Sequence, residues 1–208
     1  MKKYLKTITF VSLMTVSTSL FINGETLTIN GVGTFSEIIS KEEINNRVME
    51  LGAQIDRDYA EIEDSIVFIG ILNGCLPFLS DLMRNVKHLS KMETVRVSSY
   101  HGTLQSSGTI QLKYDSIKEN SLQGKHIIIV DDIVDTGLTM QWLIEHFTKK
   151  SPASIRIASL ILKEGCQSSQ TPNIDYVGFI SSPKFLIGCG LDYNEEYRNL
   201  PGIWALTS

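Results

Sequence analysis

Cysteine is scarce in this sequence, and its few cysteines are not arranged to bind a metal or to form a disulfide framework. The 208 residues include Cys75, Cys166 and Cys189, an odd number of widely spaced thiols with no C-x-x-C pair. Disulfide frameworks and zinc sites need paired or closely spaced cysteines. None of the four histidines has metal-ligand spacing either. These absences argue against a disulfide-stabilised secreted domain and a zinc site, and they favour a reducing compartment.

The sequence also lacks an excess of basic residues. Its 19 lysines and arginines stand against 23 acidic residues, so the net charge is −4 and the isoelectric point is near 5.6. Domains that bind nucleic acids are usually basic, because they neutralise phosphates. We therefore expect no nucleic-acid partner. Phosphate ligands are still compatible with this charge, because backbone amides bind anions without any net positive charge.

No apolar run is long enough to cross a membrane, so we expect no stable membrane association. Residues 1–33 nevertheless differ from the rest, with three lysines before a moderately apolar stretch and Glu25 as the only acid. They fit either a signal peptide or an extension that is poorly ordered or adds a strand. We favour the extension, because serines and threonines dilute the apolar stretch and no A-x-A site follows it. Within it, residues 25–29 lie between two Asn-Gly turns and predict a short edge strand.

The remaining residues, 34–208, have the pattern of one α/β domain. Their number suits a single core, and no internal repeat or low-complexity linker divides them. Short apolar runs at 65–72, 127–130, 153–162 and 174–180 predict buried strands of a mostly parallel, twisted sheet. Ser40 and Glu43 have capping-box spacing, which predicts that a helix begins there. A second helix is expected from about Pro77 to Val86, and flanking helices complete the expected fold.

The most informative stretch runs from Ile127 to Thr139. Its apolar residues predict a buried strand that ends at Val130 and is followed by an acidic loop with Asp131, Asp132 and Asp135. A Thr-Gly-x-Thr turn then precedes residues with helical spacing. The first amides of a helix have no intrahelical acceptor and bind anions, and ligands of open α/β sheets bind at the carboxyl ends of strands. Carboxylates beside an anion-binding turn suit a sugar phosphate, with or without a divalent cation.

Four other segments attract attention. Asn73-Gly74 and Lys163 each follow a predicted strand, although alone they fit a plain connection and a solvated strand end. Residues 93–113 predict a long hairpin whose polar, glycine-rich tip is either a lid over an active site or simply an exposed tip. The segment after Ser181 is rich in glycine, aromatic and charged residues. It predicts a small C-terminal hood lobe rather than a layer of the core.

Together these segments resemble the hypoxanthine-guanine phosphoribosyltransferases, which are type I phosphoribosyltransferases. Residues 130–139 resemble the phosphoribosyl-diphosphate motif of that family, and residues 71–74 resemble its diphosphate loop. Ser99-Tyr100 opens what resembles its mobile catalytic loop. Lys163, residues 184–188 and residues 191–198 resemble its purine-binding segments in order and spacing. The resemblance covers about residues 35–203, and four motifs in the same order make coincidence implausible.

The resemblance implies a set of residues around the sugar and its phosphates. Asp131 and Asp132 would accept hydrogen bonds from the ribose hydroxyls, directly or through magnesium. The 5′-phosphate would be wrapped by four consecutive residues: Thr136, Gly137, Leu138 and Thr139. The diphosphate would be held by a loop whose first peptide is often cis in the family: Leu72, Asn73 and Gly74.

The resemblance also implies residues around the base and a second magnesium ion. Asp135 would lie near N7 of the purine and move its proton. Lys163 would donate to the 6-oxo group, Phe185 would stack on the base, and the backbone of Leu186 would read its other edge. The last two implied contacts lie close to the diphosphate. Asp192 would bind the second magnesium ion there, and Arg198 would contact the diphosphate itself.

The resemblance implies an enzyme of purine salvage. It would transfer the 5-phosphoribosyl group of 5-phosphoribosyl 1-diphosphate to N9 of hypoxanthine and guanine, with Mg²⁺ as cofactor and diphosphate as the second product. A lysine at position 163 favours 6-oxopurines, because it would not accept a hydrogen bond from the amino group of adenine. Cytoplasmic location is expected, since salvage uses cytosolic phosphoribosyl diphosphate. Family members are commonly homodimers or homotetramers, so we expect one of these assemblies.

Three positions depart from the family pattern, the mildest being Asp131, where many relatives have glutamate. Many relatives have lysine where Asn73 stands, so the diphosphate loop lacks a charge here, and some have lysine at Leu138. An alternative function is a regulatory protein of the same fold that binds phosphoribosyl diphosphate and nucleic acid. The retained Asp135 and the absence of a basic patch argue against it. A receiver domain and a transferase for adenine or xanthine are further alternatives; the Asp-Thr-Gly-x-Thr turn does not fit the receiver domain.

Overall fold

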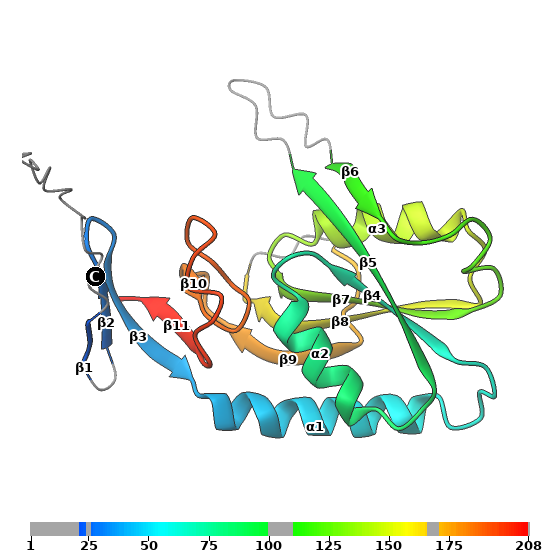
Figure 1. Ribbon diagram of the computed structural model, residues 1–208, viewed down its shortest axis with the longest axis horizontal. Coiled ribbons are helices and arrows are strands. Elements are labelled where there is room, and N and C mark those ends of the chain that lie inside the picture. Colours follow the sequence, from blue (N-terminus) through cyan, green and yellow to red (C-terminus); the bar gives the residue numbers. More distant parts are fainter. Residues whose placement is uncertain (1–20, 24–25, 100–109, 166–170, 208) are drawn as a thin grey trace, which may run out of the picture.

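A six-stranded sheet forms the body of the protein (Figure 1). The computed structural model describes residues 21–23, 26–99, 110–165 and 171–207. The strand order is β6-β5-β4-β7-β8-β9, and every neighbouring pair is parallel except β5 and β6. The strands are β4 (Ile66–Ile71), β5 (Ser90–Ser99), β6 (Ile110–Asp115), β7 (His126–Val134), β8 (Ser154–Lys163) and β9 (Tyr176–Ser181). The mostly parallel α/β sheet predicted from the sequence is confirmed.

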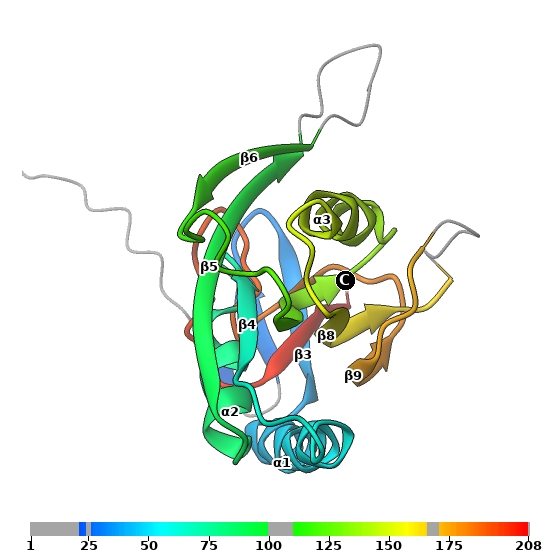
Figure 2. The same cartoon turned by 90° about the vertical axis from the view of Figure 1, so that its right-hand side faces the viewer.

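Three helices cover the two faces of this sheet: α1 (Lys41–Asp58), α2 (Leu76–Asn85) and α3 (Leu138–Thr148). Helices α1 and α2 lie on one face and α3 on the other (Figure 2). The predicted helix starts are confirmed: Ser40 and Glu43 form the expected capping box, and Pro77 lies in the first turn of α2. No helix in the described ranges is both long and apolar enough to span a membrane.

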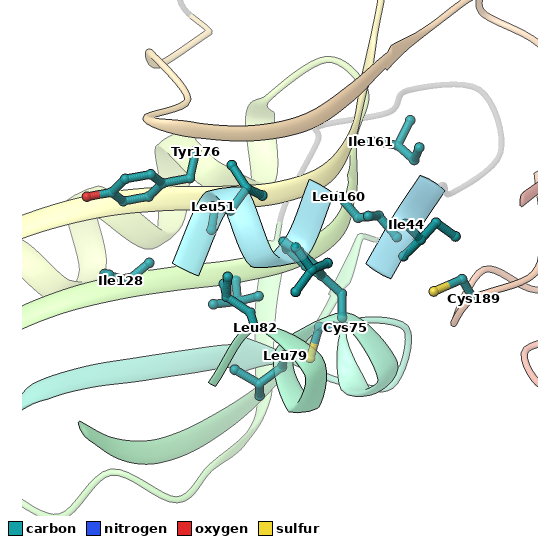
Figure 3. Packing of buried hydrophobic residues seen from close by; sticks show 14 of the residues in the cluster. Ile44, Leu51, Cys75, Leu79, Leu82, Ile128, Leu160, Ile161, Tyr176 and Cys189 are labelled. Carbon is teal, nitrogen blue, oxygen red and sulfur yellow. The ribbon is translucent and has the colours of Figure 1, made fainter. Parts of the chain in front are cut away.

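The central strand β7 is apolar on both faces because both faces are covered. Ile127 and Ile129 pack with the buried side of α3, whereas Ile128 and Val130 pack with α1 and α2. Figure 3 shows the hydrophobic cluster that Ile128 forms with residues of α1 and α2. All four side chains are fully buried. Burial of an aliphatic side chain of this size stabilises the fold by about 1.5 to 3 kcal/mol, so the strand is held firmly where the acidic residues begin.

A second, antiparallel sheet lies beside the first, with the order β1-β2-β3-β11-β10. Its strands are β1 (Phe21–Asn23), β2 (Thr26–Ile29), β3 (Gly33–Ile39), β10 (Leu186–Ile187) and β11 (Ile203–Leu206). The predicted strand at 25–29 is therefore confirmed as β2, but it is not an edge strand, because β1 and β3 pair with its two sides. The hood lobe was expected from C-terminal residues, whereas this sheet combines strands from both ends of the chain.

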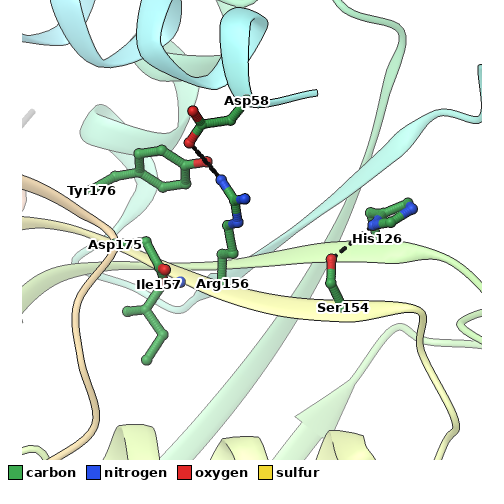
Figure 4. A network of polar contacts seen from close by, with 7 residues as sticks. All are labelled: Asp58, His126, Ser154, Arg156, Ile157, Asp175 and Tyr176. Atoms are coloured by element: carbon green, nitrogen blue, oxygen red, sulfur yellow. Dashed lines mark hydrogen bonds and ion pairs between the residues drawn. The ribbon is translucent and has the colours of Figure 1, made fainter. Parts of the chain in front are cut away.

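A polar network joins α1 to β8 and β9 at the amino ends of these strands (Figure 4). Nη1 of Arg156 lies 2.5 Å from Oδ2 of Asp58, and the hydroxyl of Tyr176 donates to the same carboxylate at 2.9 Å. The guanidinium also lies 5.0 Å from the centroid of the Tyr59 ring. These groups are partly buried, so their mutual pairing offsets the cost of removing them from water. The network fixes the end of α1 against the sheet.

We predict that Arg156→Met destabilises the protein by about 1 to 2 kcal/mol, because it leaves Asp58 without its cation while preserving the volume of the side chain. Denaturant unfolding monitored by circular dichroism would measure the loss. Substrate binding should not change, since Arg156 and Lys163 are separated by seven strand residues, or about 23 Å. Arg156→Lys is the matched control and should lose less stability. A loss of binding without a loss of stability would contradict this assignment.

Candidate active site

Asp131 and Asp132 lie inside β7, not in a loop after it. The strand was predicted to end at Val130, but it continues to Val134, and Asp131, Ile133 and Val134 all have partners in β8. The prediction was wrong because β8 runs on to Lys163 and offers those partners. The acidic pair is therefore held by strand geometry at the carboxyl end of the sheet, where neighbouring strands β4 and β8 also end.

These two carboxylates are costly to keep ionised. Burial raises the pKa of Asp131 well above its usual range, and the adjacent negative charge of Asp132 raises it further. Burial also raises the pKa of Asp132, although the backbone amide of Ile133, 3.0 Å from its Oδ1, and the positive charge of Arg198 oppose the shift. Such a pair favours ligands that bring hydrogen-bond donors or positive charge.

The loop after β4 packs directly against this acidic pair. Its Leu72-Asn73 peptide is cis, as the family resemblance implied. Gly74 lies so close to Asp132 that a Cβ atom on residue 74 would overlap the carboxylate. Gly190, with φ +100°, lies equally close to the carbonyl oxygen of Gly74. Two glycines thus let three separate segments meet at one point, and a larger residue at either position would separate them.

Asp192 and Arg198 belong to the same group of residues. Nη2 of Arg198 lies 2.8 Å from Oδ1 of Asp192, and Nη1 donates to the carbonyl oxygen of Gly190 at 2.6 Å. Asp192 also accepts the amide of Glu195 at 2.8 Å. The predicted second magnesium ligand and the predicted diphosphate contact are therefore adjacent, and both lie next to the Gly74 loop.

The turn after β7 surrounds a cavity of about 110 Å³. It is lined by consecutive residues from the strand end to the first turn of α3, together with Asp131: Ile133, Val134, Asp135, Thr136, Gly137, Leu138, Thr139 and Met140. Gly137 is the N-cap of α3 and has a left-handed φ of +79°. Because the first amides of a helix lack intrahelical acceptors, this turn at the start of α3 is a candidate anion site.

Lys163 and Asp135 lie side by side because β7 and β8 pair up to Val134 and Leu162. Nζ of Lys163 is 3.1 Å from Oδ2 of Asp135. The carboxylate is half exposed and the lysine largely buried. The two residues predicted to contact N7 and the 6-oxo group, on one edge of the base, thus lie side by side at the carboxyl edge of the sheet.

Phe185 and Leu186 come from the second sheet. Leu186 begins β10 and is buried, whereas the side chain of Phe185 is 44% exposed. The ring of Phe185 meets those of Phe35 and Tyr193 edge-on. Of the predicted catalytic loop, Ser99 is the last residue of β5, and β5 and β6 form the arms of the expected hairpin. Tyr100 and the hairpin tip lie outside the described residues.

Within the described ranges, no three His, Cys, Asp or Glu side chains converge as a metal site. Mg²⁺ rarely needs such a cage, because it usually retains water and is shared between one or two carboxylates and substrate phosphates. The hard oxygen donors of Asp131, Asp132 and Asp192 are the ligand type that Mg²⁺ prefers. The residues present therefore fit a magnesium ion that arrives with a phosphate-bearing substrate.

Comparison with known proteins identifies the family to which this chain belongs. A family model described as the phosphoribosyl transferase domain matches residues 36–194. The hypoxanthine-guanine phosphoribosyltransferase of Streptococcus pneumoniae is 38% identical over 169 residues, covering 81% of this chain and 91% of that protein. That of Dictyostelium discoideum is 39% identical over 173 residues, covering 81% and 93%. The chain belongs to the hypoxanthine-guanine phosphoribosyltransferase family.

Solved structures of this family share the fold. The hypoxanthine phosphoribosyltransferase of Staphylococcus aureus superposes with a TM-score of 0.75 at 34% identity, covering 83% of this chain and 91% of that one. The Bacillus anthracis enzyme gives 0.72 at 32% identity, covering 82% and 96%. Family membership makes this chain an enzyme, and its fold is the type I phosphoribosyltransferase fold.

Two residues of the site were not predicted from the sequence. Thr171 donates from its hydroxyl to the carbonyl oxygen of Thr136 at 2.8 Å, and its methyl group lies against Gly137. Gly190 provides the close contact with Gly74 described above. The Gly-Cys-Gly sequence at 188–190 was a signal for the second residue, since paired glycines often mark close backbone approach. Thr171 carried no such signal, because only the folded chain brings it to the turn.

We predict that Asp131→Asn stabilises the protein by about 1 kcal/mol at pH 7.5, because it removes the charge of a partly buried carboxylate that lies beside Asp132. The native pKa of Asp131 is raised, so ionisation costs stability above that pKa and costs nothing once the pH falls below the unfolded-state pKa. The gain should therefore shrink between pH 7.5 and pH 4. Urea unfolding at several pH values would measure it. A gain that grew towards acid pH would show that the carboxylate is ionised without penalty.

We also predict that Gly74→Ala weakens binding of phosphoribosyl diphosphate by about tenfold or more, because the new methyl group displaces the carboxylate of Asp132 or the loop itself. Isothermal titration calorimetry in the presence of Mg²⁺ would measure the change. Gly124→Ala is the control for glycine replacement as such: its φ of +68° makes the alanine strained, but nothing lies within 4 Å of a Cβ atom there, so it should lower stability without weakening binding. Equal affinities for wild type and Gly74→Ala would mean that the close contact is not needed for binding.

Proposed function

We propose that this enzyme salvages 6-oxopurines by joining them to a phosphoribosyl group. The observation that carries the proposal is the meeting, at one sheet edge, of the acidic pair, the anion cavity and the Asp135–Lys163 pair. The first two suit a sugar with a 5′-phosphate, and the third suits a purine with an oxygen at position 6. The relatives named above, hypoxanthine-guanine phosphoribosyltransferases, support the same reaction class.

In the proposed reaction, N9 of the base forms a bond to the anomeric carbon of 5-phosphoribosyl 1-diphosphate, and the bond from that carbon to the diphosphate oxygen breaks. IMP or GMP and diphosphate are the products. Asp131 and Asp132 accept hydrogen bonds from the ribose hydroxyls, which fixes the sugar. The amides of residues 136–139 hold the 5′-phosphate. Because both the hydroxyls and the 5′-phosphate of the sugar are held, its reactive carbon has a defined position. Such orientation accelerates a displacement reaction.

The base is held by groups with complementary chemistry. Lys163 is a hydrogen-bond donor only and therefore selects a 6-oxo group over the 6-amino group of adenine. Asp135 receives a hydrogen bond from N7 and takes its proton as N9 becomes bonded to the sugar. Phe185 offers its exposed ring for stacking. Base binding exchanges the ion pair between Lys163 and Asp135 for a contact from each residue to the purine.

The leaving diphosphate is held by the 72–74 loop and Arg198. Asn73 contributes no charge, so the cationic contact from the protein comes from Arg198, which Asp192 already orients. When bound with the substrate through Asp131, Asp132 and Asp192, magnesium neutralises developing charge on the diphosphate. We further propose cytoplasmic location, where phosphoribosyl diphosphate is made, and assembly as a homodimer or homotetramer.

We predict diphosphate release when the protein is mixed with phosphoribosyl diphosphate, Mg²⁺ and hypoxanthine or guanine, and little with adenine. Omitting the metal or adding EDTA should abolish release. A coupled diphosphate assay with each base would measure this. Release with none of the purines would contradict the proposal, and binding of phosphoribosyl diphosphate without turnover would favour the regulatory alternative.

We predict that Asp135→Asn lowers kcat by about 100-fold or more while IMP binding changes little, because the amide keeps a polar contact but cannot accept the proton. Steady-state kinetics and IMP titration would separate the two effects. The control is Glu145→Gln, which neutralises an exposed carboxylate on α3 and should leave both values unchanged. Full turnover by Asp135→Asn would exclude the proton-transfer role.

A further inference from the structure

Phe185 lies just before a short strand, and its ring meets two neighbouring rings. It immediately precedes the two-residue strand β10, and its carbonyl oxygen accepts the amide of Leu206 at 3.0 Å. Its ring centroid lies 6.4 Å from that of Phe35 at an interplanar angle of 67°, and 6.0 Å from that of Tyr193 at 88°. Neither neighbour is parallel to Phe185, so neither uses the ring as a stacking surface, and 44% of the residue is exposed.

Phe35 is the more rigid of the two neighbours. It is fully buried in β3, where it is registered between Leu27 of β2 and Leu206 of β11. Leu27 is also fully buried, and both belong to a cluster with Ile187 and Trp204 from the C-terminal strands. Side chains directly opposite one another in neighbouring strands constrain each other. The N-terminal strand β2 therefore holds Phe35 in place from one side.

Both Phe35 and β2 lie outside residues 36–194, the region that matches the phosphoribosyl transferase domain. The motifs that carried the family resemblance likewise assigned them no role. The ring of Phe35 meets that of Phe185, and β2 reaches Phe185 only through Phe35, so the folded structure reveals an arrangement that the sequence motifs did not predict. It links the N-terminal extension to the recognition of the purine.

We propose that Phe35 is a positioning residue for the purine base, and that β2 serves to hold it. The inference rests on the proposed function, in which Phe185 stacks on the base. Removing the ring of Phe35 would leave a cavity beside Phe185, and cavities in a packed interior are costly unless neighbours move into them. The half-exposed ring of Phe185 is free to make that movement. It would then present less of its surface to a base, while the phosphate turn would be unchanged.

The experiment compares two ligands that differ only in the base. IMP carries both the purine and the sugar phosphate, whereas ribose 5-phosphate lacks the purine. We expect Phe35→Ala to weaken IMP binding by about three- to tenfold, the range of one aromatic edge contact, and to leave ribose 5-phosphate binding within about twofold. Leu27→Ala should give a smaller effect with the same selectivity, and Phe35→Leu an intermediate one. Isothermal titration calorimetry on the full chain provides the constants.

A double-mutant cycle distinguishes positioning from general weakening of the fold. If Phe35 acts through Phe185, then Phe35→Ala should add little to the loss of IMP binding caused by Phe185→Ala. Phe147→Ala is the matched control, because it removes an equally buried ring at the far end of α3. It should destabilise the protein without selective loss of IMP. Additive effects, or equal losses for both ligands, would overturn the proposal.

A wrong assignment of the purine site and a wrong role for Phe35 would give different results. If wild type binds IMP no more tightly than ribose 5-phosphate, the purine site itself is wrongly assigned, and the role of Phe35 falls with it. If wild type prefers IMP and Phe35→Ala keeps the full preference, the proposed function stands and only the positioning role is refuted. Should Phe35→Ala fail to fold, Leu27→Ala and Phe35→Leu carry the same test.

Discussion

The parallel pairing of β7 with β4 and β8 is the constraint on which the rest of this protein depends. Parallel strands that start in register end at the same edge, so residues far apart in sequence meet there. Gly70 of β4 is registered with Val130, and Val134 with Leu162. Those alignments bring the diphosphate loop, the acidic pair and Lys163 to the same edge of the sheet. The apolar residues of β7, buried on both faces, supply the free energy that keeps this arrangement.

The sheet is stable, but the candidate site at its edge lowers the stability of the fold. Two adjacent carboxylates are withdrawn from water at the end of the strand, and their pKa values rise in consequence. Close contacts at Gly74 and Gly190 leave no room for side chains that would shield them. Sites of binding often carry such local cost, which a ligand of the right chemistry relieves. In the proposed reaction the ribose hydroxyls, with or without a magnesium ion, would provide this relief.

Much of the main sheet could be predicted from sequence, because its signals are local. The apolar run of 127–130 and the Ser40–Glu43 spacing each identify an element without reference to any other part of the chain. The extent of β7 could not be predicted in this way. Asp131 and Asp132 are poor strand residues, and the strand continues through them because β8 is long enough to pair with Asp131, Ile133 and Val134.

In the candidate site, too, the local features could be predicted from the sequence and the non-local ones could not. The positions of residues 131–139 follow from one continuous segment, and the ion pair between Asp135 and Lys163 follows from the strand order. Thr171 and Phe35 could not be placed, because each acts through a neighbour that is remote in sequence. The composition of the second sheet was missed for that reason too: short strands at opposite ends of a chain contain no signal that they will pair.

That pairing has a consequence for how the chain is made. The hydroxyl of Thr207 donates to the carbonyl oxygen of Thr34, 173 residues earlier, and β11 lies beside β3 throughout. During synthesis the amino-terminal strands emerge first, yet β3 cannot gain this neighbour until residues 203–206 have left the ribosome. The large sheet has all its strands before then. A chain cut short near residue 200 would therefore possess the strands around the sugar-phosphate site while lacking the neighbour that completes the base-side sheet.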